Sequence, residues 1–567
     1  MKNKSPYIEV QTSTKSCWEG WNKIADTLNA KIKSLHSRKI IITVECYQGT
    51  YEDINLRELK KRIPVNATCT SRDVFKNEEE INRLCEKDLA GMPFSAKAST
   101  NDIEDYFDPN KLAALRQNID FIEEGVILIF GVGASKICTP DILIYADMSR
   151  WEILQRFKRN DVSNVGVSNN NLSFDLQYRW SYFIDWKICD KLKKQLLGQC
   201  DYFLETNNWE KPKLATGDII REALIQSTTQ PFFTAPFYDP ELWEANNYIQ
   251  EQKEDEFSWV FNCVAEENNI LFRINGYLIE VPSINVIYME PKRLLGDTVY
   301  NHFGSELPIR MVFIDNLDGA QENLHIYPDI DFLKDNFGVY YSQGETFYIM
   351  DTNPGARLRL GFKKEINKKN LPELLNKNNS ISKTALDKWL NTVSVKKHDH
   401  INIPAGLVHS HGNNTMILRI TSAPDIFSFK IPEDILDPDE MGQTSAGMAT
   451  DRLIPVPISE DTIYDQYYHP SDTTGSTSNE DILNQEGDQL SIKRLWFEDK
   501  LLQQTNGCIQ VLNLVEGEEA IVDSPQNKFK PFVVHFAESF IIPAGITEYT
   551  ITPTVKHKTC AVLKISV

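Results

Sequence analysis

Histidine, tyrosine and glutamate side chains recur at strand spacing in the second half of this 567-residue chain. His325 and Tyr327 lie two residues apart in NLHIYPD, and His409 and His411 lie two residues apart in GLVHSHG. Residues i and i+2 of a β-strand project on one face, so each pair can point into the same barrel interior. Glu345 opens the run ETFYIMD, where a carboxylate on an inward apolar face is costly unless it is paired or bound to a metal.

Histidines and a glutamate that converge inside a β-barrel would form an open zinc site, because catalytic zinc typically has three protein ligands and a water. The alternative is that these side chains are surface residues or hydrogen-bonded polar residues of a core, as single histidines usually are. The residues therefore support a Zn²⁺ hypothesis that depends on closure of the barrel.

The segments that would carry these residues have the pattern of antiparallel strands. Between about residues 236 and 440, apolar and polar residues alternate, and Gly, Pro, Asn or Asp closes most runs. Residues 363–391 predict a helical insertion in this domain. Residues 441–489 are expected to be a linker, because their end, 470–489, is polar and poor in apolar residues. Residues 490–567 repeat the short-strand pattern, and FIIPAGITEYTI echoes INIPAGLVHSHG as strand, Pro-Ala-Gly turn and strand. Two tandem jelly-roll barrels are expected, and any metal belongs to the first.

The second block resembles the class I, cupin-type mannose-6-phosphate isomerases. The match lies in the order and spacing of three segments, NLHIYPDIDFLKDNFG (323–338), ETFYIMDTNPGARLRLGFK (345–363) and LNTVSVKKHDHINIPAGLVHSHG (390–412). PFYDPELW (236–243) resembles the family's opening segment, and the third block fits its second, metal-free cupin. The resemblance covers about residues 236–567 and implies two cupin domains.

The resemblance also implies a metal-ligand set. The family's zinc glutamine falls on His325, its first zinc histidine on Tyr327, its glutamate on Glu345 and its later histidine on His409. Histidine can replace an amide ligand, whereas a neutral tyrosine is a poor zinc ligand. His411 could supply the missing ligand.

The family's catalytic arginine falls on Lys430, which lacks the planar fork of arginine, and the lysine two residues before the glutamate falls on Gln343. The resemblance implies aldose–ketose interconversion of mannose 6-phosphate and fructose 6-phosphate through an enediol, with a sugar phosphate as partner. The alternative is a catalytically impaired relative that binds a sugar or sugar phosphate as a sensor or scaffold.

The first block, residues 1–235, alternates strands with helices, which predicts a doubly wound α/β domain with a mostly parallel sheet. Its clearest elements are strands at 39–47, 125–133 and 140–148 and helices at 55–63 and 149–160. It resembles the P-loop nucleoside-kinase fold, yet the chain contains no GxxxxGK[ST] motif. We therefore expect a kinase-like scaffold without kinase activity; phosphoryl transfer by this block is the weaker alternative.

Charge and composition limit the remaining classes. The formal net charge of −20 opposes sequence-independent binding of nucleic acid and docking on anionic membranes. The longest apolar run, residues 126–134, is too short to span a bilayer, and the N-terminus has no signal-peptide core. Ten cysteines without a CxxC pair favour reduced thiols. A cytoplasmic protein is expected.

Overall fold

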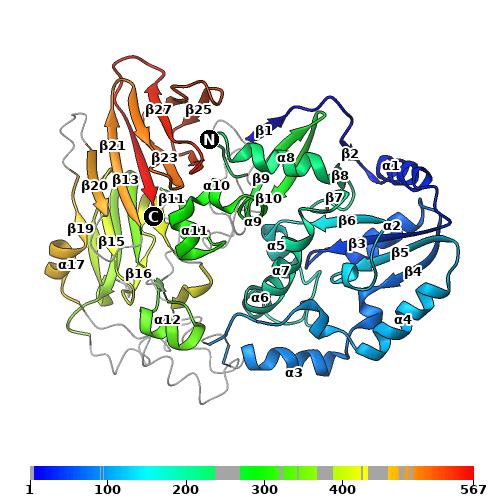
Figure 1. Ribbon diagram of the computed structural model, residues 1–567. Coiled ribbons are helices and arrows are strands. Elements are labelled where there is room, and N and C mark those ends of the chain that lie inside the picture. Colours follow the sequence, from blue (N-terminus) through cyan, green and yellow to red (C-terminus); the bar gives the residue numbers. More distant parts are fainter. Residues whose placement is uncertain are drawn as a thin grey trace, which may run out of the picture. The chain divides into compact units, whose positions relative to one another are not determined.

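The computed structural model describes residues 6–89, 91–92, 95–235, 268–317, 324–340, 344–366, 387–422, 425–431, 458–471, 479–483 and 490–567. The chain divides into two compact units. The described residues of the α/β unit lie within Ser5–Thr228 and Ala265–Pro291, and those of the β-rich unit lie within Thr229–Val264 and Lys292–Val567. Figure 1 labels many of the elements of both units.

The α/β unit is built on a seven-stranded sheet with the order β2-β8-β7-β6-β3-β5-β4. Its strands are β2 (Cys17–Glu19), β3 (Lys39–Cys46), β4 (Val65–Thr70), β5 (Gly125–Gly131), β6 (Ile142–Asp147), β7 (Tyr202–Glu205) and β8 (Lys213–Thr216). The strands from β4 to β7 pair in parallel, whereas β8 is antiparallel to β7 and to β2. The earliest parallel strand, β3, is central, and later strands add on both sides, which is the doubly wound order that the sequence predicts.

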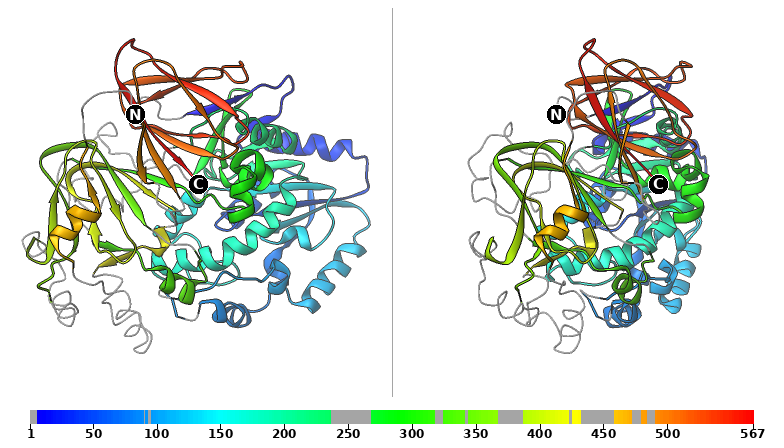
Figure 2. Two further views of the ribbon diagram at one scale, coloured as in Figure 1. Left: turned by 60° about the vertical axis from the view of Figure 1, so that its left-hand side comes forward. Right: turned by 90° about the vertical axis from the view of Figure 1, so that its left-hand side faces the viewer.

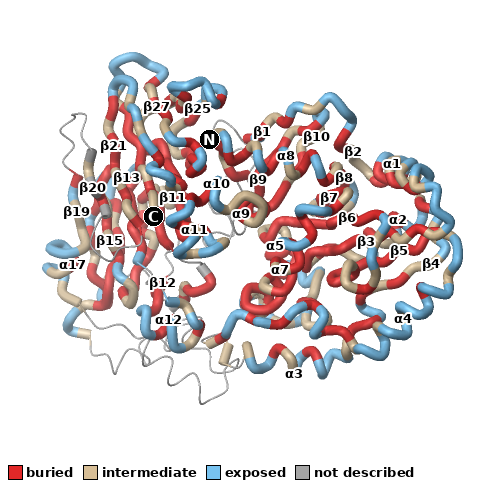
Figure 3. Tube along the Cα trace, in the orientation of Figure 1, coloured by how far each residue is buried: buried red, intermediate tan, exposed pale blue. Residues whose placement is uncertain are grey.

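The central strands form because their sequences are continuous apolar runs. β5 and β6 are buried along nearly their whole length, as parallel strands covered on both faces must be (Figure 3). The three predicted strands are confirmed. The helices are α1 (Trp21–Ser34), α2 (Glu52–Lys60), α3 (Glu78–Leu89), α4 (Pro109–Phe121), α5 (Arg150–Lys158), α6 (Phe174–Trp180), α7 (Trp186–Leu196) and α8 (Gly217–Ser227). Ser149 caps α5 by accepting a hydrogen bond from the backbone N–H of Glu152, which starts that helix near its predicted position.

A small three-stranded sheet joins residues from far along the chain to the N-terminus. β9 (Asn269–Ile274) pairs in parallel with β1 (Tyr7–Val10) and forms a hairpin with β10 (Tyr277–Pro282). The helix α9 (Ile284–Met289) follows. The predicted first β domain, 236–440, includes this segment, whereas the structure groups it with the α/β unit because β9 hydrogen-bonds to β1.

The β-rich unit begins with a curled nine-stranded sheet. The strands are β11 (Arg310–Asn316), β12 (Leu324–Ile326), β13 (Glu345–Phe362), β14 (Leu390–Ser394), β15 (His400–Ile403), β16 (His409–Ser410), β17 (Asn413–Thr421), β18 (Phe429–Ile431) and β19 (Tyr468–His469). The long strand β13 pairs with β14, β15, β16 and β17 along its length. Its inward residues, including Phe347 and Ile349, pack with Leu358, Ile401 and Ile417 in one core.

The C-terminal part is a two-sheet sandwich beside the curled sheet (Figure 2). One sheet has the order β20-β21-β28-β23-β26 and the other β22-β27-β24-β25. The strands are β20 (Asn479–Leu483), β21 (Ser491–Phe497), β22 (Leu501–Gln504), β23 (Gln510–Glu516), β24 (Glu519–Asp523), β25 (Phe532–His535), β26 (Ser539–Ile542), β27 (Glu548–Pro553) and β28 (Cys560–Ser566). Both Pro-Ala-Gly turns lie between strands, as their shared pattern predicts.

Part of the predicted linker, 441–489, forms a strand. Residues 479–483, within the predicted linker, form the edge strand β20, and Glu480 pairs with Arg494 of the neighbouring strand. Most of the predicted helical insertion, 363–391, lies outside the described residues. The described helices of this unit are α10 (Pro291–Leu295), α11 (Asp297–Phe303), α12 (Ile330–Phe337) and α17 (Glu460–Gln466). Within the described ranges, every helix is too short or too polar to cross a bilayer.

Candidate active site

The curled sheet brings together the residues that the sequence singles out. His325 lies on β12, and Tyr327 follows that strand directly. Glu345 is the first residue of β13, and His409 begins β16 after the Pro-Ala-Gly turn. β12 and β16 pair so that His325 and His409 lie directly opposite each other.

The closest contact in this cluster joins Glu345 to His409. The Nε2 atom of His409 lies 2.8 Å from Oε2 of Glu345, and both side chains are 1% exposed. Despite this short distance, neither His409 Nε2 nor either Glu345 oxygen has a hydrogen-bond partner among the described residues. The contact therefore lacks the geometry of a hydrogen bond.

The other nitrogen of His409 explains this geometry. Nδ1 lies 3.0 Å from the carbonyl oxygen of Leu407, and since a carbonyl only accepts, Nδ1 carries a proton. In neutral His409, Nε2 then presents a lone pair toward the carboxylate. Two electron-rich atoms at this distance require a positive charge between them, either a proton or a metal ion. A ligating histidine typically donates its other N–H to a carbonyl in this way.

Two further imidazoles lie beside this pair. The ring centroids of His325 and His411 are 4.7 Å apart, and those of His325 and His409 are 6.3 Å apart. Burial, together with the nearby His325, Arg419 and His409, holds the pKa of His411 well below its usual range. His411 is therefore neutral at neutral pH, and its buried Nε2 has no hydrogen-bond partner among the described residues.

Tyr327 packs against the cluster through its ring. The ring lies parallel to that of His409, with centroids 6.2 Å apart and an interplanar angle of 5°. Its hydroxyl oxygen accepts a hydrogen bond from Nη1 of Arg419 at 3.4 Å. The residue is 2% exposed, so the phenol is a buried, oriented group.

Arg419 is a site residue that sequence reasoning missed. It lies on β17, is 2% exposed, and places Nη1 3.7 Å from Oε1 of Glu345. The signal was present in the sequence as the lone charged residue of the apolar run MILRI. Lys430, the predicted catalytic residue, pairs through its backbone with His325 on β18, but its side chain is outside the described part, as is Gln343.

The donor chemistry of the cluster fits a divalent metal. The orphaned buried atoms are a carboxylate and two imidazole nitrogens, on Glu345, His409 and His411, and these are typical zinc ligands. Within the residues that the structure describes, no three histidine, cysteine or acidic side chains already converge at metal-binding distance. The fit is therefore one of ligand type and unsatisfied atoms.

One comparison with known proteins gives a match to the α/β unit. A family model described as a domain of unknown function, DUF8485, matches residues 20–229. No curated protein matches the sequence.

Similar solved structures are isomerases in name. A putative mannosephosphate isomerase from Archaeoglobus fulgidus is 14% identical, with 59% of this chain and 95% of that chain covered and a TM-score of 0.41. A mutant phosphomannose isomerase from Salmonella typhimurium is 13% identical, with 59% and 99% covered and a TM-score of 0.44. The mannose 6-phosphate isomerase from Bacillus subtilis is 14% identical, with 59% and 99% covered and a TM-score of 0.38. At these values the similarity carries no conclusion on activity, which must come from the site itself.

Proposed function

We propose that the β-rich unit is a metal-dependent sugar-phosphate isomerase that interconverts mannose 6-phosphate and fructose 6-phosphate. The observation that carries this proposal is the 2.8 Å approach of His409 Nε2 to Glu345 Oε2 without a hydrogen bond. A buried carboxylate and a buried imidazole lone pair held in this way are suited to a divalent cation.

Glu345 and His409 would hold the metal, and His325 or His411 would supply a third ligand. When bound, the metal supplies Lewis-acid stabilisation of the negative charge that develops on the substrate oxygens. An imidazole that stays unprotonated can bind a metal through its lone pair, which favours His411 as the third ligand and leaves His325 to carry the proton between C1 and C2. Arg419 and Lys430 would stabilise the enediolate electrostatically.

The direct experiment is to assay isomerisation of mannose 6-phosphate with Zn²⁺, Co²⁺ and Mn²⁺ each supplied in turn. We expect turnover with at least one metal and its loss in His409→Ala. His469→Ala, at a histidine on β19, is the matched control and should retain activity. A folded protein without turnover in any metal would contradict the proposal.

Two further variants separate the roles of the remaining imidazoles. The proposal expects one of His325→Ala and His411→Ala to lose bound metal and the other to keep metal but lose turnover. If both variants retain metal and full turnover, neither residue acts in the site.

A second candidate function is binding of a sugar or sugar phosphate without turnover, as a sensor or scaffold. It is favoured by Tyr327, which replaces a further imidazole: its ring lies parallel to that of His409, and its hydroxyl accepts a hydrogen bond from Arg419. This candidate predicts saturable binding of mannose 6-phosphate with no fructose 6-phosphate formed.

A further inference from the structure

The α/β unit contains a pocket of about 460 Å³ at the carboxyl ends of β3, β4 and β5. Its walls come from residues 48–54 after β3, residues 71–76 after β4, Val132 after β5 and the loop 161–168. Ligands of open α/β sheets bind at this end of the strands, and the volume is within the range of about 300–1,000 Å³ typical of small-molecule sites. The kinase-like character of this unit stays a prediction, so the chemistry of the residues that line the pocket decides which ligand fits.

The backbone amides at the end of β5 are already occupied by carboxylates of the chain. Gly131 and Gly133 have φ values of 122° and 84°, and a turn with such angles presents successive N–H groups to one side. Glu45 accepts from the N–H of Gly133 at 2.6 Å and from that of Ser135 at 2.8 Å. These amides at the end of β5 are therefore not free to bind a phosphate.

The charges in the walls cancel. Arg72 pairs with Glu52 at 3.2 Å and with Asp53 at 3.5 Å. Asp161 pairs with Arg159 at 2.8 Å. The remaining lining cation is Lys76, so three carboxylates face three cations when Arg159 is included. A ligand with a large net charge of either sign finds no matching excess.

One wall of the pocket contains a buried side-chain amide, that of Gln48, whose nitrogen lacks a hydrogen-bond partner among the described residues. Gln48 is 1% exposed and lines the pocket. Its Oε1 accepts a hydrogen bond from Nε1 of Trp186 at 3.0 Å, which fixes the amide orientation. Its Nε2 donor has no hydrogen-bond partner among the described residues, and a buried donor without a partner is destabilising. A ligand with an acceptor oxygen would satisfy it.

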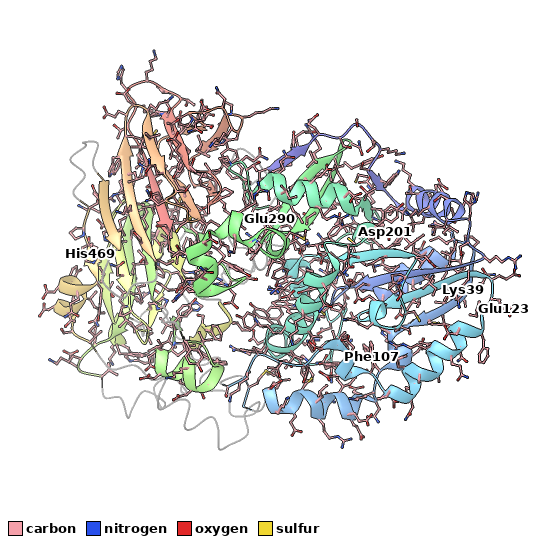
Figure 4. The ribbon with its side chains drawn as sticks, in the orientation of Figure 1. Lys39, Phe107, Glu123, Asp201, Glu290 and His469 are labelled. Atoms are coloured by element: carbon pink, nitrogen blue, oxygen red, sulfur yellow. The ribbon has the colours of Figure 1, made fainter. Side chains whose placement is uncertain are left out.

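One wall is aromatic and apolar. Phe75 lines the pocket and stacks on Phe107, labelled in Figure 4, with centroids 5.8 Å apart. Val132 and Val165 extend this surface. The combination of an apolar face with paired carboxylates and an amide donor suits a molecule that has C–H faces and many hydroxyls.

We propose that this pocket binds an uncharged polyhydroxylated molecule of monosaccharide size. Hydroxyl groups both donate and accept, so one such ligand can accept from Gln48 and donate to the carboxylates of Glu52 and Asp53. The inference is independent of the isomerase proposal, because all its residues belong to the α/β unit.

The test is calorimetric titration of the full chain with D-mannose, D-fructose, D-glucose and myo-inositol, beside inorganic phosphate and ATP. His409→Ala is used as the background, so that binding at the curled sheet is removed. Gln48→Glu replaces the donor by an acceptor, and Ser168→Trp fills the pocket from an exposed position. Ser37→Trp, at an exposed serine outside the pocket, is the matched control.

We expect saturable binding of at least one of the four neutral probes, weakened at least tenfold by Gln48→Glu and by Ser168→Trp and unchanged by Ser37→Trp. Ser168→Trp keeps the test valid if Gln48→Glu does not fold. Failure of all four neutral probes to bind would overturn the proposal. It would also be overturned by binding that both pocket variants leave intact, or by phosphate or ATP binding that Ser168→Trp abolishes.

Discussion

Each unit has a buried glutamate, and the two differ in whether their carboxylate oxygens accept hydrogen bonds. Glu45 at the end of β3 accepts two backbone N–H groups, so its carboxylate is satisfied by the chain itself. Glu345 at the start of β13 is equally buried, but its oxygens have no hydrogen-bond donor among the described residues and face the Nε2 of His409. Burial of a carboxylate therefore does not by itself mark a reactive site. The unsatisfied carboxylate is the one poised for a ligand.

The largest expected effect comes from neutralising Glu345. In Glu345→Gln the carboxylate ligand is lost, and isomerase turnover should fall by more than about 100-fold, since changes to groups that only support a ligand cost about 10–100-fold. The thermal midpoint of the metal-free protein should not fall, because the carboxylate contributes no hydrogen bond there. A steady-state assay and a melting curve check both. A large drop in the thermal midpoint with activity retained would mean that Glu345 stabilises the fold and does not act in the site.

Removing the carboxylate of Glu45 should lower the stability of the protein and leave its turnover unchanged. Glu45→Ala leaves the N–H groups of Gly133 and Ser135 without acceptors, which should lower the free energy of unfolding by about 2–6 kcal/mol, at about 1–3 kcal/mol each. Urea unfolding measures this loss. Turnover per folded molecule should be unchanged. Loss of turnover in folded protein would contradict the assignment of the isomerase site to the β-rich unit alone.

The variant Arg419→Lys tests how far the candidate active site depends on the guanidinium group of Arg419. Arg419→Lys retains the charge, but the lysine side chain is shorter and has no nitrogen at the position of Nη1, the atom that lies beside both Glu345 and the Tyr327 hydroxyl. We expect kcat to fall about 10–100-fold, as when one electrostatic donor weakens in a transition state, with a smaller change in KM. Equal kcat for both proteins would remove Arg419 from the chemistry.

A pH dependence of stability comes last, because its effect is small for each pH unit. Burial raises the pKa of Glu45 to about 7 from 4.5, while the amide bonds oppose this rise. Between these values the unfolded chain is ionised and the folded chain retains its proton, so stability falls as pH rises, by at most about 1.4 kcal/mol per pH unit. Glu45→Gln should flatten this slope between pH 4.5 and 7. Parallel curves for the wild type and the variant would contradict the raised pKa.

Much of the scaffold could be predicted because it rests on local patterns. The apolar runs of β3, β5 and β6 predict a buried parallel sheet, and the repeated Pro-Ala-Gly turn predicts strands on both sides. The association of residues 268–291 with the N-terminus could not be predicted in this way, since pairing of β9 with β1 joins strands more than 250 residues apart.

The candidate site was only partly accessible from sequence. The spacing of His325, Glu345 and His409 indicates one interior, and the structure places them together. The role of Arg419 depends on which face of β17 points inward, and strand alternation alone does not reveal that its guanidinium reaches Tyr327. The orphaned atoms likewise depend on distances that no sequence pattern contains.

The zinc content of the chain is the sharpest test of whether Glu345 and His409 bind a metal ion. The chain is saturated with Zn²⁺, dialysed, and analysed by mass spectrometry of the metal, alongside His409→Ala and the control His469→Ala. We predict about one tightly bound zinc per chain in the wild type and the control, as one set of three protein ligands holds one ion, and none in His409→Ala. Equal zinc content in the wild type and His409→Ala, or none in the wild type, would contradict the account.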